Sequence, residues 1–137
     1  MSLDTVKNLM KEVGWGFLAT SDGSKVGVRP MGSCVWMDNE LWAATTDGTD
    51  KINQLRQVPY AEYCFMDREG KHVRIAGHCR ISTDNGDKLK LYEAVPALKK
   101  YYKDPSTPEY VVIRMKPERI LFMAQTGRGY EDIELPK

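Results

Sequence analysis

One cluster of hydroxyl and cationic side chains surrounds the start of a predicted helix. The cluster consists of Thr45, Thr46, Thr49 and Lys51. The free amides and the dipole of a helix N-terminus attract anions, and Lys51 adds a full positive charge in the first turn. The cluster is therefore able to hold a phosphate, or it is an ordinary capped helix with a solvated lysine. Asp50 favours the second interpretation, because a carboxylate beside a phosphate repels it.

A second group of residues interrupts a long predicted strand. It consists of Arg29, Pro30, Met31 and Gly32. An arginine on a strand usually points into solvent. Alternatively, Arg29 faces a groove and pairs with an anionic ligand, while the irregularity at Pro30 exposes backbone to a flat ring. The residue types alone leave both interpretations open.

The other reactive residue types form no catalytic or metal-binding pattern. Cys34, Cys64 and Cys79 include no Cys-x-x-Cys pair, and His72 and His78 do not have the spacing of zinc ligands. We therefore expect buried, reduced thiols, histidines at the surface and no metal ion. No serine lies in a Gly-x-Ser-x-Gly motif, so the sequence assigns no catalytic residue.

The elements that must position these residues are mostly short strands. Strands are predicted at 15–20, 25–36, 41–45, 60–67, 71–82, 110–115 and 119–124, and helices at 3–13, 49–57, 87–94 and 96–102. Turn residues recur about every ten positions, which is typical of an antiparallel meander. Pro30 places its strand at an edge or in a bulge, and Lys116–Glu118 is predicted as a corner. Six or so strands in so small a chain favour a closed barrel.

The three tryptophans invite a separate interpretation. Trp15, Trp36 and Trp42 all lie in or beside predicted strands. Tryptophan commonly fills the interior of small barrels and subunit contacts. We therefore expect them in the core or at a subunit interface rather than in a stacking platform for bases.

Length and charge restrict the class of protein. The chain has 137 residues, with 20 basic and 19 acidic side chains and a net charge of +1. These values predict one domain over residues 1–137 and argue against a nucleic-acid partner, which needs clustered positive charge. No apolar run is long enough to span a bilayer, and the N-terminal segment does not resemble a signal peptide. With unpaired cysteines, these features predict a cytoplasmic location and no membrane partner.

Six short segments follow one another in a characteristic order. They are Gly-Phe-Leu-Ala-Thr at 16–20, Arg-Pro-Met at 29–31, Leu-Trp-Ala-Ala-Thr-Thr at 41–46, Thr-x-Lys-x-x-x-Leu at 49–55, the strand 73–81 and Lys-Pro-Glu-Arg-Ile at 116–120. Their order and spacing, over residues 4–124, resemble the pyridoxamine 5′-phosphate oxidase-like FMN-binding split-barrel family. The resemblance implies a mainly β fold, a six-stranded antiparallel split β-barrel with a few short flanking helices.

The family resemblance also implies a cofactor and an assembly. FMN would bind in a groove between two identical subunits. Its ring would lie along Arg29, Pro30, Met31 and Gly32, and its phosphate would be held by Thr45, Thr46, Thr49 and Lys51. Many members carry a basic residue where this chain has Asp50. The chain lacks the C-terminal Arg-x-His element with which the oxidase itself grips its substrate, so it resembles the short single-domain members.

The resemblance leads to a functional expectation with two alternatives. The expected function is a homodimeric flavoprotein that reduces a small oxidised substrate with NAD(P)H. The first alternative is a non-enzymatic flavin- or haem-binding protein with a role in stress responses. The second is a relative that depends on a deazaflavin.

Overall fold

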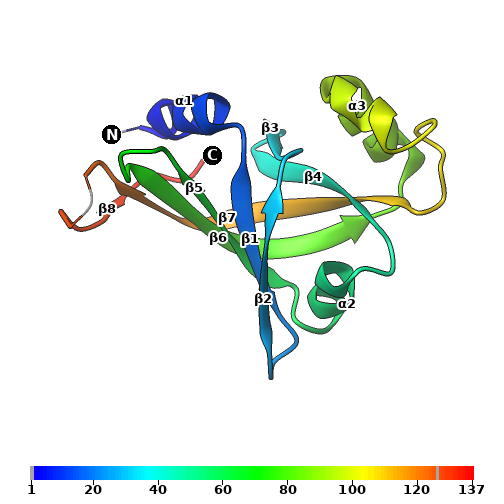
Figure 1. The fold of residues 1–137 in the computed structure, drawn as a ribbon, viewed down its shortest axis with the longest axis horizontal. Coiled ribbons are helices and arrows are strands. Elements are labelled where there is room, and N and C mark those ends of the chain that lie inside the picture. Colours follow the sequence, from blue (N-terminus) through cyan, green and yellow to red (C-terminus); the bar gives the residue numbers. More distant parts are fainter. Residues whose placement is uncertain (1, 126) are drawn as a thin grey trace.

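The computed structural model describes residues 2–125 and 127–137. The element order is α1 (Leu3–Val13), β1 (Gly16–Ser21), β2 (Val26–Met31), β3 (Val35–Met37), β4 (Glu40–Thr46), α2 (Asp50–Gln57), β5 (Tyr60–Met66), β6 (His72–Ser82), α3 (Asn85–Ala94), the 3₁₀ helix η1 (Pro96–Lys100), β7 (Tyr110–Met123) and β8 (Glu131–Asp132). The strands form one strongly curved sheet, and the helices lie around it (Figure 1). The expected mainly β, antiparallel fold is confirmed.

The sheet differs from the expected closed barrel of six strands. Its strands follow the order β2-β1-β5-β6-β7-β4-β3, and β8 pairs with β7. The described residues thus form eight strands, and the two end strands do not pair with each other. The predicted strand 25–36 is divided into β2 and β3, which lie at opposite ends of this order. Within residues 2–125 and 127–137, β2 pairs with β1 alone, so Pro30 lies on an edge strand, which is one of the two predicted placements.

The predicted corner at Lys116–Glu118 is wrong, because β7 runs without a break through these residues. The register with β6 shifts at this point: Ala76 faces Arg119, whereas Gly77 faces Pro117. A Cβ atom at Gly77 would overlap the Lys116 carbonyl oxygen and lie 3.0 Å from the Pro117 Cα. The glycine therefore lets the two backbones approach closely, and the extra residue of β7 is accommodated in a bulge.

Helix α1 closes one side of the core. Val6, Leu9 and Met10 are its buried residues, and the helix ends at Gly14, as predicted. Gly14 has a φ of 77°, and its amide donates to the Met10 carbonyl at 2.9 Å. The chain then enters β1 through Trp15, which is 59% exposed and does not belong to the core.

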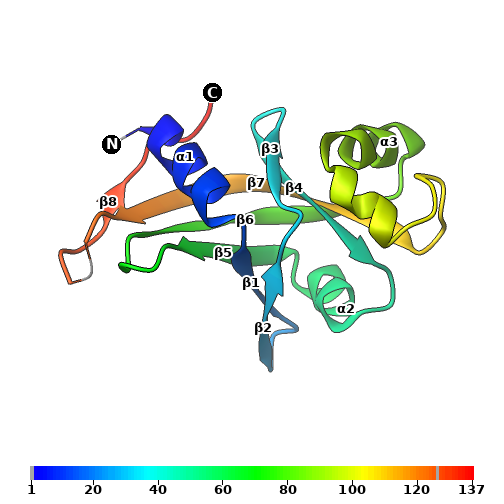
Figure 2. The same ribbon diagram turned by 45° about the horizontal axis from the view of Figure 1, so that its top comes forward.

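A second buried cluster holds α3 and η1 against the outer face of β4 and β7. The cluster includes Trp42, Leu91, Tyr92, Leu98, Tyr102 and Tyr110. Arg114 of β7 adds two ion pairs, to Glu40 of β4 at 2.7 Å and to Asp87 of α3 at 3.1 Å. In Figure 2, α3 and η1 lie at one end of the sheet, and α2 lies at the same end near its lower edge. This arrangement brings η1 close to the end of β4.

The sequence predicts reduced, buried thiols and no segment that spans a membrane, and the structure bears on both predictions. All three cysteines are free, with Cys79 buried and Cys34 and Cys64 half-buried. Burial raises the pKa of Cys34 and of Cys79 to about 12, so both thiols stay protonated at neutral pH. Among the helices in the described ranges, none combines the length and apolar character needed to cross a membrane.

Candidate functional site

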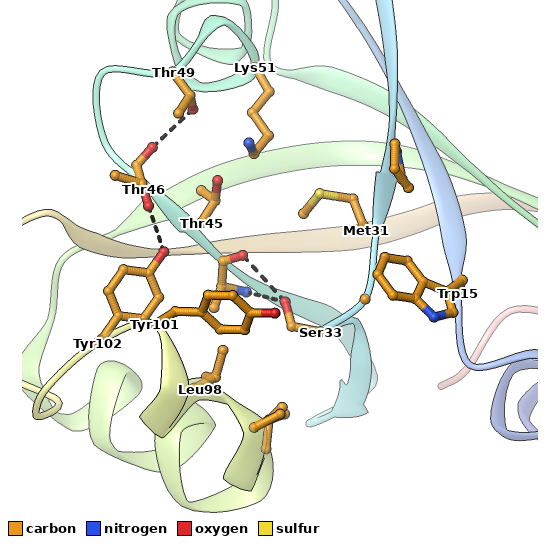
Figure 3. Close-up of a pocket in the computed structure, with 15 residues that line it drawn as sticks. Trp15, Met31, Ser33, Thr45, Thr46, Thr49, Lys51, Leu98, Tyr101 and Tyr102 are labelled. Atoms are coloured by element: carbon orange, nitrogen blue, oxygen red, sulfur yellow. Dashed lines mark hydrogen bonds between the residues drawn. The ribbon is translucent and has the colours of Figure 1, made fainter.

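A pocket of about 500 Å³ lies between the end of β2, the end of β4, the start of α2 and the helix η1 (Figure 3). Seven of the eight site residues predicted from the sequence line it, namely Pro30, Met31, Gly32, Thr45, Thr46, Thr49 and Lys51. These residues come from two segments that are separate in the sequence, so the fold brings both predicted groups to one cavity. The eighth residue, Arg29, is not part of the lining.

The lysine end of the pocket combines hydroxyl groups with a helix N-terminus. Helix α2 begins at Asp50, and Thr49 is its N-cap residue. The Thr49 hydroxyl does not cap the helix amides; it donates instead to the Thr46 carbonyl at 2.9 Å. The first turn of α2 therefore keeps the favourable potential that an anion needs. In Figure 3 the ammonium group of Lys51 points from this turn into the cavity.

Two cationic side chains share this end of the molecule. Burial lowers the pKa of Lys51, the nearby charge of Arg29 lowers it further, and Asp50 acts in the opposite direction. Burial also lowers the pKa of Arg29, again opposed by Asp50. Both cations are therefore partly removed from water. An anion bound at Lys51 would stabilise its charged form.

The guanidinium group of Arg29 lies beside the pocket and is hydrogen-bonded within the protein. Its Nη1 donates to the Thr20 hydroxyl at 2.6 Å and to the Leu18 carbonyl at 3.1 Å. Its Nη2 donates to Gln54 Oε1 at 3.4 Å, and Thr20 also donates to that oxygen. The guanidinium group therefore joins β2 and β1 to α2. It fixes the helix that carries Lys51 relative to the strand that carries Pro30 and Met31.

One wall of the pocket, beside Lys51, is apolar. Pro30, Met31 and Gly32 form one part of it, and the indole of Trp15 forms another. A Cβ atom at Gly32 would lie 3.3 Å from the Trp15 ring, so the glycine allows the indole to pack closely against the backbone. This arrangement offers an apolar surface to a planar ligand.

Several lining residues were not predicted from the sequence. Ser33 accepts a hydrogen bond from the Ala44 amide at 3.1 Å and so connects the segment after β2 to β4. Tyr101 and Tyr102 enter from the end of η1, where the Tyr102 hydroxyl lies 2.7 Å from that of Thr46. The sequence contains a weak signal for them, a short predicted helix at 96–102. The sequence of this predicted helix does not indicate which strand the helix contacts, so it could not place the two tyrosines in the pocket.

The described residues contain no group of three or more His, Cys, Asp or Glu side chains that could hold a metal ion. His72 instead contacts the Gly70 carbonyl and the Tyr130 hydroxyl, both at 2.8 Å. The chemistry of the pocket therefore rests on one cation, a helix N-terminus, several hydroxyl groups and an apolar surface. This donor set fits a ligand that carries a phosphate at one end and a flat ring at the other.

A family model described as pyridoxamine 5′-phosphate oxidase like matches residues 2–128. A search of curated proteins finds no match to the chain.

Solved structures with the same fold cover nearly the whole chain. A NimC/NimA family protein from Clostridium acetobutylicum is 23% identical with a TM-score of 0.83, and the alignment covers 96% of this chain and 90% of that one. General Stress Protein 26 from Bacillus anthracis is 20% identical with a TM-score of 0.77, over 94% and 96% of the two chains. A pyridoxamine 5′-phosphate oxidase-related, FMN binding protein from Nostoc punctiforme is 16% identical with a TM-score of 0.72, over 93% and 83%.

Proposed function

The chain belongs to the pyridoxamine 5′-phosphate oxidase-like family, and from this premise we propose that it is an FMN-binding oxidoreductase that reduces a small oxidised substrate with NAD(P)H. The observation that carries the proposal is the pocket itself, in which Lys51 and the start of α2 adjoin an apolar wall that includes Pro30, Met31 and Trp15. The compared protein from Nostoc punctiforme, described as FMN binding, supports the choice of cofactor.

Different residues of the pocket would contact the phosphate and the ring of FMN. Lys51, Thr45 and Thr46 would hold the phosphate, together with the amides of the first turn of α2. Pro30, Met31 and Gly32 would support the ring and keep water from one side of it. When bound, the flavin supplies the hydride-transfer chemistry, and the protein orients it. Arg29 would contribute by fixing α2 against β2 rather than by contacting the ring.

The absorbance spectrum of the purified protein tests this proposal first. We expect the two visible bands of a flavin, or their appearance with saturation when FMN is titrated into colourless protein. Oxidation of NADH or NADPH in the presence of a quinone or nitro compound then tests turnover. Protein that neither carries nor takes up FMN would contradict the proposed function.

A non-catalytic binding role is the second candidate. The observation in its favour is that the described lining contains no carboxylate, histidine or thiol that could exchange a proton with a substrate. A flavin-loaded protein that oxidises neither nicotinamide donor would support this candidate. The spectrum also separates the cofactor alternatives, because haem and deazaflavins absorb at wavelengths different from those of FMN.

An exposed apolar face on β1 and β2 supports assembly into a homodimer. Phe17 is 51%, Val26 83% and Val28 68% exposed. The register aligns Phe17 with Pro30, and Ser21 with Val26, so these side chains share one face of the two strands. A contiguous apolar face of this kind is typical of a contact between proteins. We propose that a second copy of the chain covers it and completes the groove beside Pro30.

A charge placed on this face should separate the subunits. We expect Val28→Asp to shift the protein from a dimer to its 15.6 kDa monomer, because a carboxylate would be buried without a partner. Light scattering coupled to size-exclusion chromatography measures the mass directly. Thr83→Asp, which adds the same charge at an exposed position between β6 and α3, is the control and should remain dimeric. A wild-type protein that is monomeric would contradict the proposed assembly.

A further inference from the structure

The hydroxyl groups at the lysine end of the pocket differ in whether they still have a proton to donate. The Thr49 hydroxyl donates its proton to the Thr46 carbonyl at 2.9 Å. The hydroxyls of Thr46 and Tyr102 lie 2.7 Å apart, and either can be the donor. Two hydroxyls carry two protons, and their mutual hydrogen bond uses one of them. The pair therefore keeps one O–H proton for a ligand, whereas Thr49 has none left.

The Tyr102 side chain is fixed in place before any ligand binds. It is 8% exposed, and its ring stacks on Tyr110 with a centroid distance of 4.9 Å. Tyr110 in turn donates to the Lys88 carbonyl at 2.7 Å, and the Tyr92 hydroxyl donates to the Tyr102 carbonyl at 2.9 Å. The Tyr102 hydroxyl thus reaches Thr46 from a packed aromatic cluster, and little conformational entropy is lost when it acts on a ligand.

We propose that Tyr102 is a positioning residue for the phosphate of FMN: it donates to the Thr46 hydroxyl and thereby leaves the Thr46 proton for the phosphate. A phenol is a stronger donor than an aliphatic alcohol, which favours this direction, and donating chains of hydroxyls strengthen one another. The inference rests on the proposed function. In this proposal the phosphate donor is the Thr46 hydroxyl and not the Thr49 hydroxyl predicted from the sequence. We call the chain of hydrogen bonds from Tyr102 through Thr46 to the phosphate the hydroxyl relay.

The ratio of FMN to riboflavin affinity isolates the phosphate contribution, because the two ligands differ only in that group. We expect Tyr102→Phe, which keeps the ring that stacks on Tyr110, to raise the dissociation constant of FMN about tenfold. The dissociation constant of riboflavin should not change. Calorimetric titration of the cofactor-free protein with each ligand measures both values. Thr46→Val should give the same result, and the double variant should lose little more than either single variant, since both changes break one relay.

Three further variants act as controls. Thr46→Ser keeps the hydroxyl and should retain the wild-type ratio. Tyr101→Phe removes the neighbouring hydroxyl on a side chain that is 75% exposed, and it should leave the ratio unchanged. Thr49→Val removes no phosphate donor, but the turn that it loosens carries Lys51 and the first amides of α2. It therefore measures how much a disturbed start of α2 by itself lowers FMN affinity, and Tyr102→Phe should lower the FMN to riboflavin ratio further in that background.

The outcomes separate this inference from the proposed function. If Tyr102→Phe weakens FMN and riboflavin equally, or weakens neither, Tyr102 does not act on the phosphate and the inference is overturned. If Thr49→Val alone lowers the FMN to riboflavin ratio, the hydroxyl relay does not act on the phosphate and the inference is again overturned. If the wild-type protein takes up no FMN at all, the proposed function itself fails.

Discussion

Lys51→Ala should raise the dissociation constant of FMN about tenfold to a hundredfold, which corresponds to about 1.5–3 kcal/mol. The variant removes the ammonium group that points into the pocket from the first turn of α2 (Figure 3). Charge-assisted hydrogen bonds to a phosphate are among the strongest that a protein makes, and this one is partly shielded from water. Titration of cofactor-free protein with FMN, followed by flavin fluorescence, measures the change.

Riboflavin and a distant lysine provide the controls for Lys51. Riboflavin lacks the phosphate, so its affinity should be the same in the wild type and in Lys51→Ala. Lys25→Ala removes an exposed lysine in the turn between β1 and β2 and should leave both affinities unchanged. An unchanged dissociation constant for FMN in Lys51→Ala would remove Lys51 from the site.

The pH dependence of FMN binding has a defined sign. Burial and the charge of Arg29 lower the pKa of Lys51 below its ordinary value of 10.5. The cofactor-free protein therefore loses this positive charge as the pH rises toward 10.5, at a lower pH than a free lysine would. FMN affinity relative to riboflavin should fall over this alkaline range in the wild type. In Lys51→Ala this dependence should be absent.

Gly77→Ala should lower the free energy of unfolding by about 3 kcal/mol, the upper part of the range for inserting atoms into a packed interior. The new Cβ would overlap the Lys116 carbonyl oxygen, and its next neighbours are the Lys116 carbonyl carbon at 2.9 Å and the Pro117 Cα at 3.0 Å. All three atoms belong to the backbone of β7, which pairs with β6 from Val112 to Met123. A flexible side chain could rotate away, but these atoms can move only if the two central strands separate.

Gly86→Ala is the matched control for Gly77→Ala. Gly86 lies in the first turn of α3, and its nearest neighbour would be the Asp84 Oδ2 at 3.0 Å, the side-chain oxygen that caps the helix by accepting from the Asp87 amide. Alanine favours a helix over glycine, so the free energy of unfolding should change little or increase. Urea denaturation of both variants gives the comparison. A loss in Gly77→Ala no larger than in Gly86→Ala would show that β7 can yield at the bulge.

The elements that were predictable from the sequence depend on local signals. The apolar spacing of α1 and the glycine that follows it are both local, and Gly14 indeed ends the helix in a left-handed conformation. The turn before β4 is also local, since Asp38 and Asn39 adopt positive φ angles of 52° and 62° and these residue types tolerate them. Helix α2 was also predictable from a local signal, because Thr49 directly precedes it as its N-cap residue.

The errors arise where contacts between distant residues decide the structure. Pro117 indicates a corner when it is considered with its neighbours in sequence, because proline cannot donate a hydrogen bond. Gly77 on the neighbouring strand β6 lets the two backbones approach closely, so β7 continues through Pro117 with a bulge. The place of Arg29 beside a flavin ring stays a prediction, but the hydrogen bonds of its guanidinium group to Thr20 and Gln54 could not be foreseen from its neighbours in the sequence. The contact between the hydroxyls of Tyr102 and Thr46 likewise joins residues far apart in the chain.

The pairing of β4 with β7 determines when the pocket can exist during synthesis of the chain. Thr45 faces Val111 and Thr46 faces Tyr110, so the strand that ends at the lysine side of the pocket pairs with a strand that is synthesised much later. A nascent chain that ends before β7 contains every lining residue, from Trp15 to Tyr102, but not the strand that aligns them. The site is therefore completed only after β7 has been synthesised and has left the ribosome.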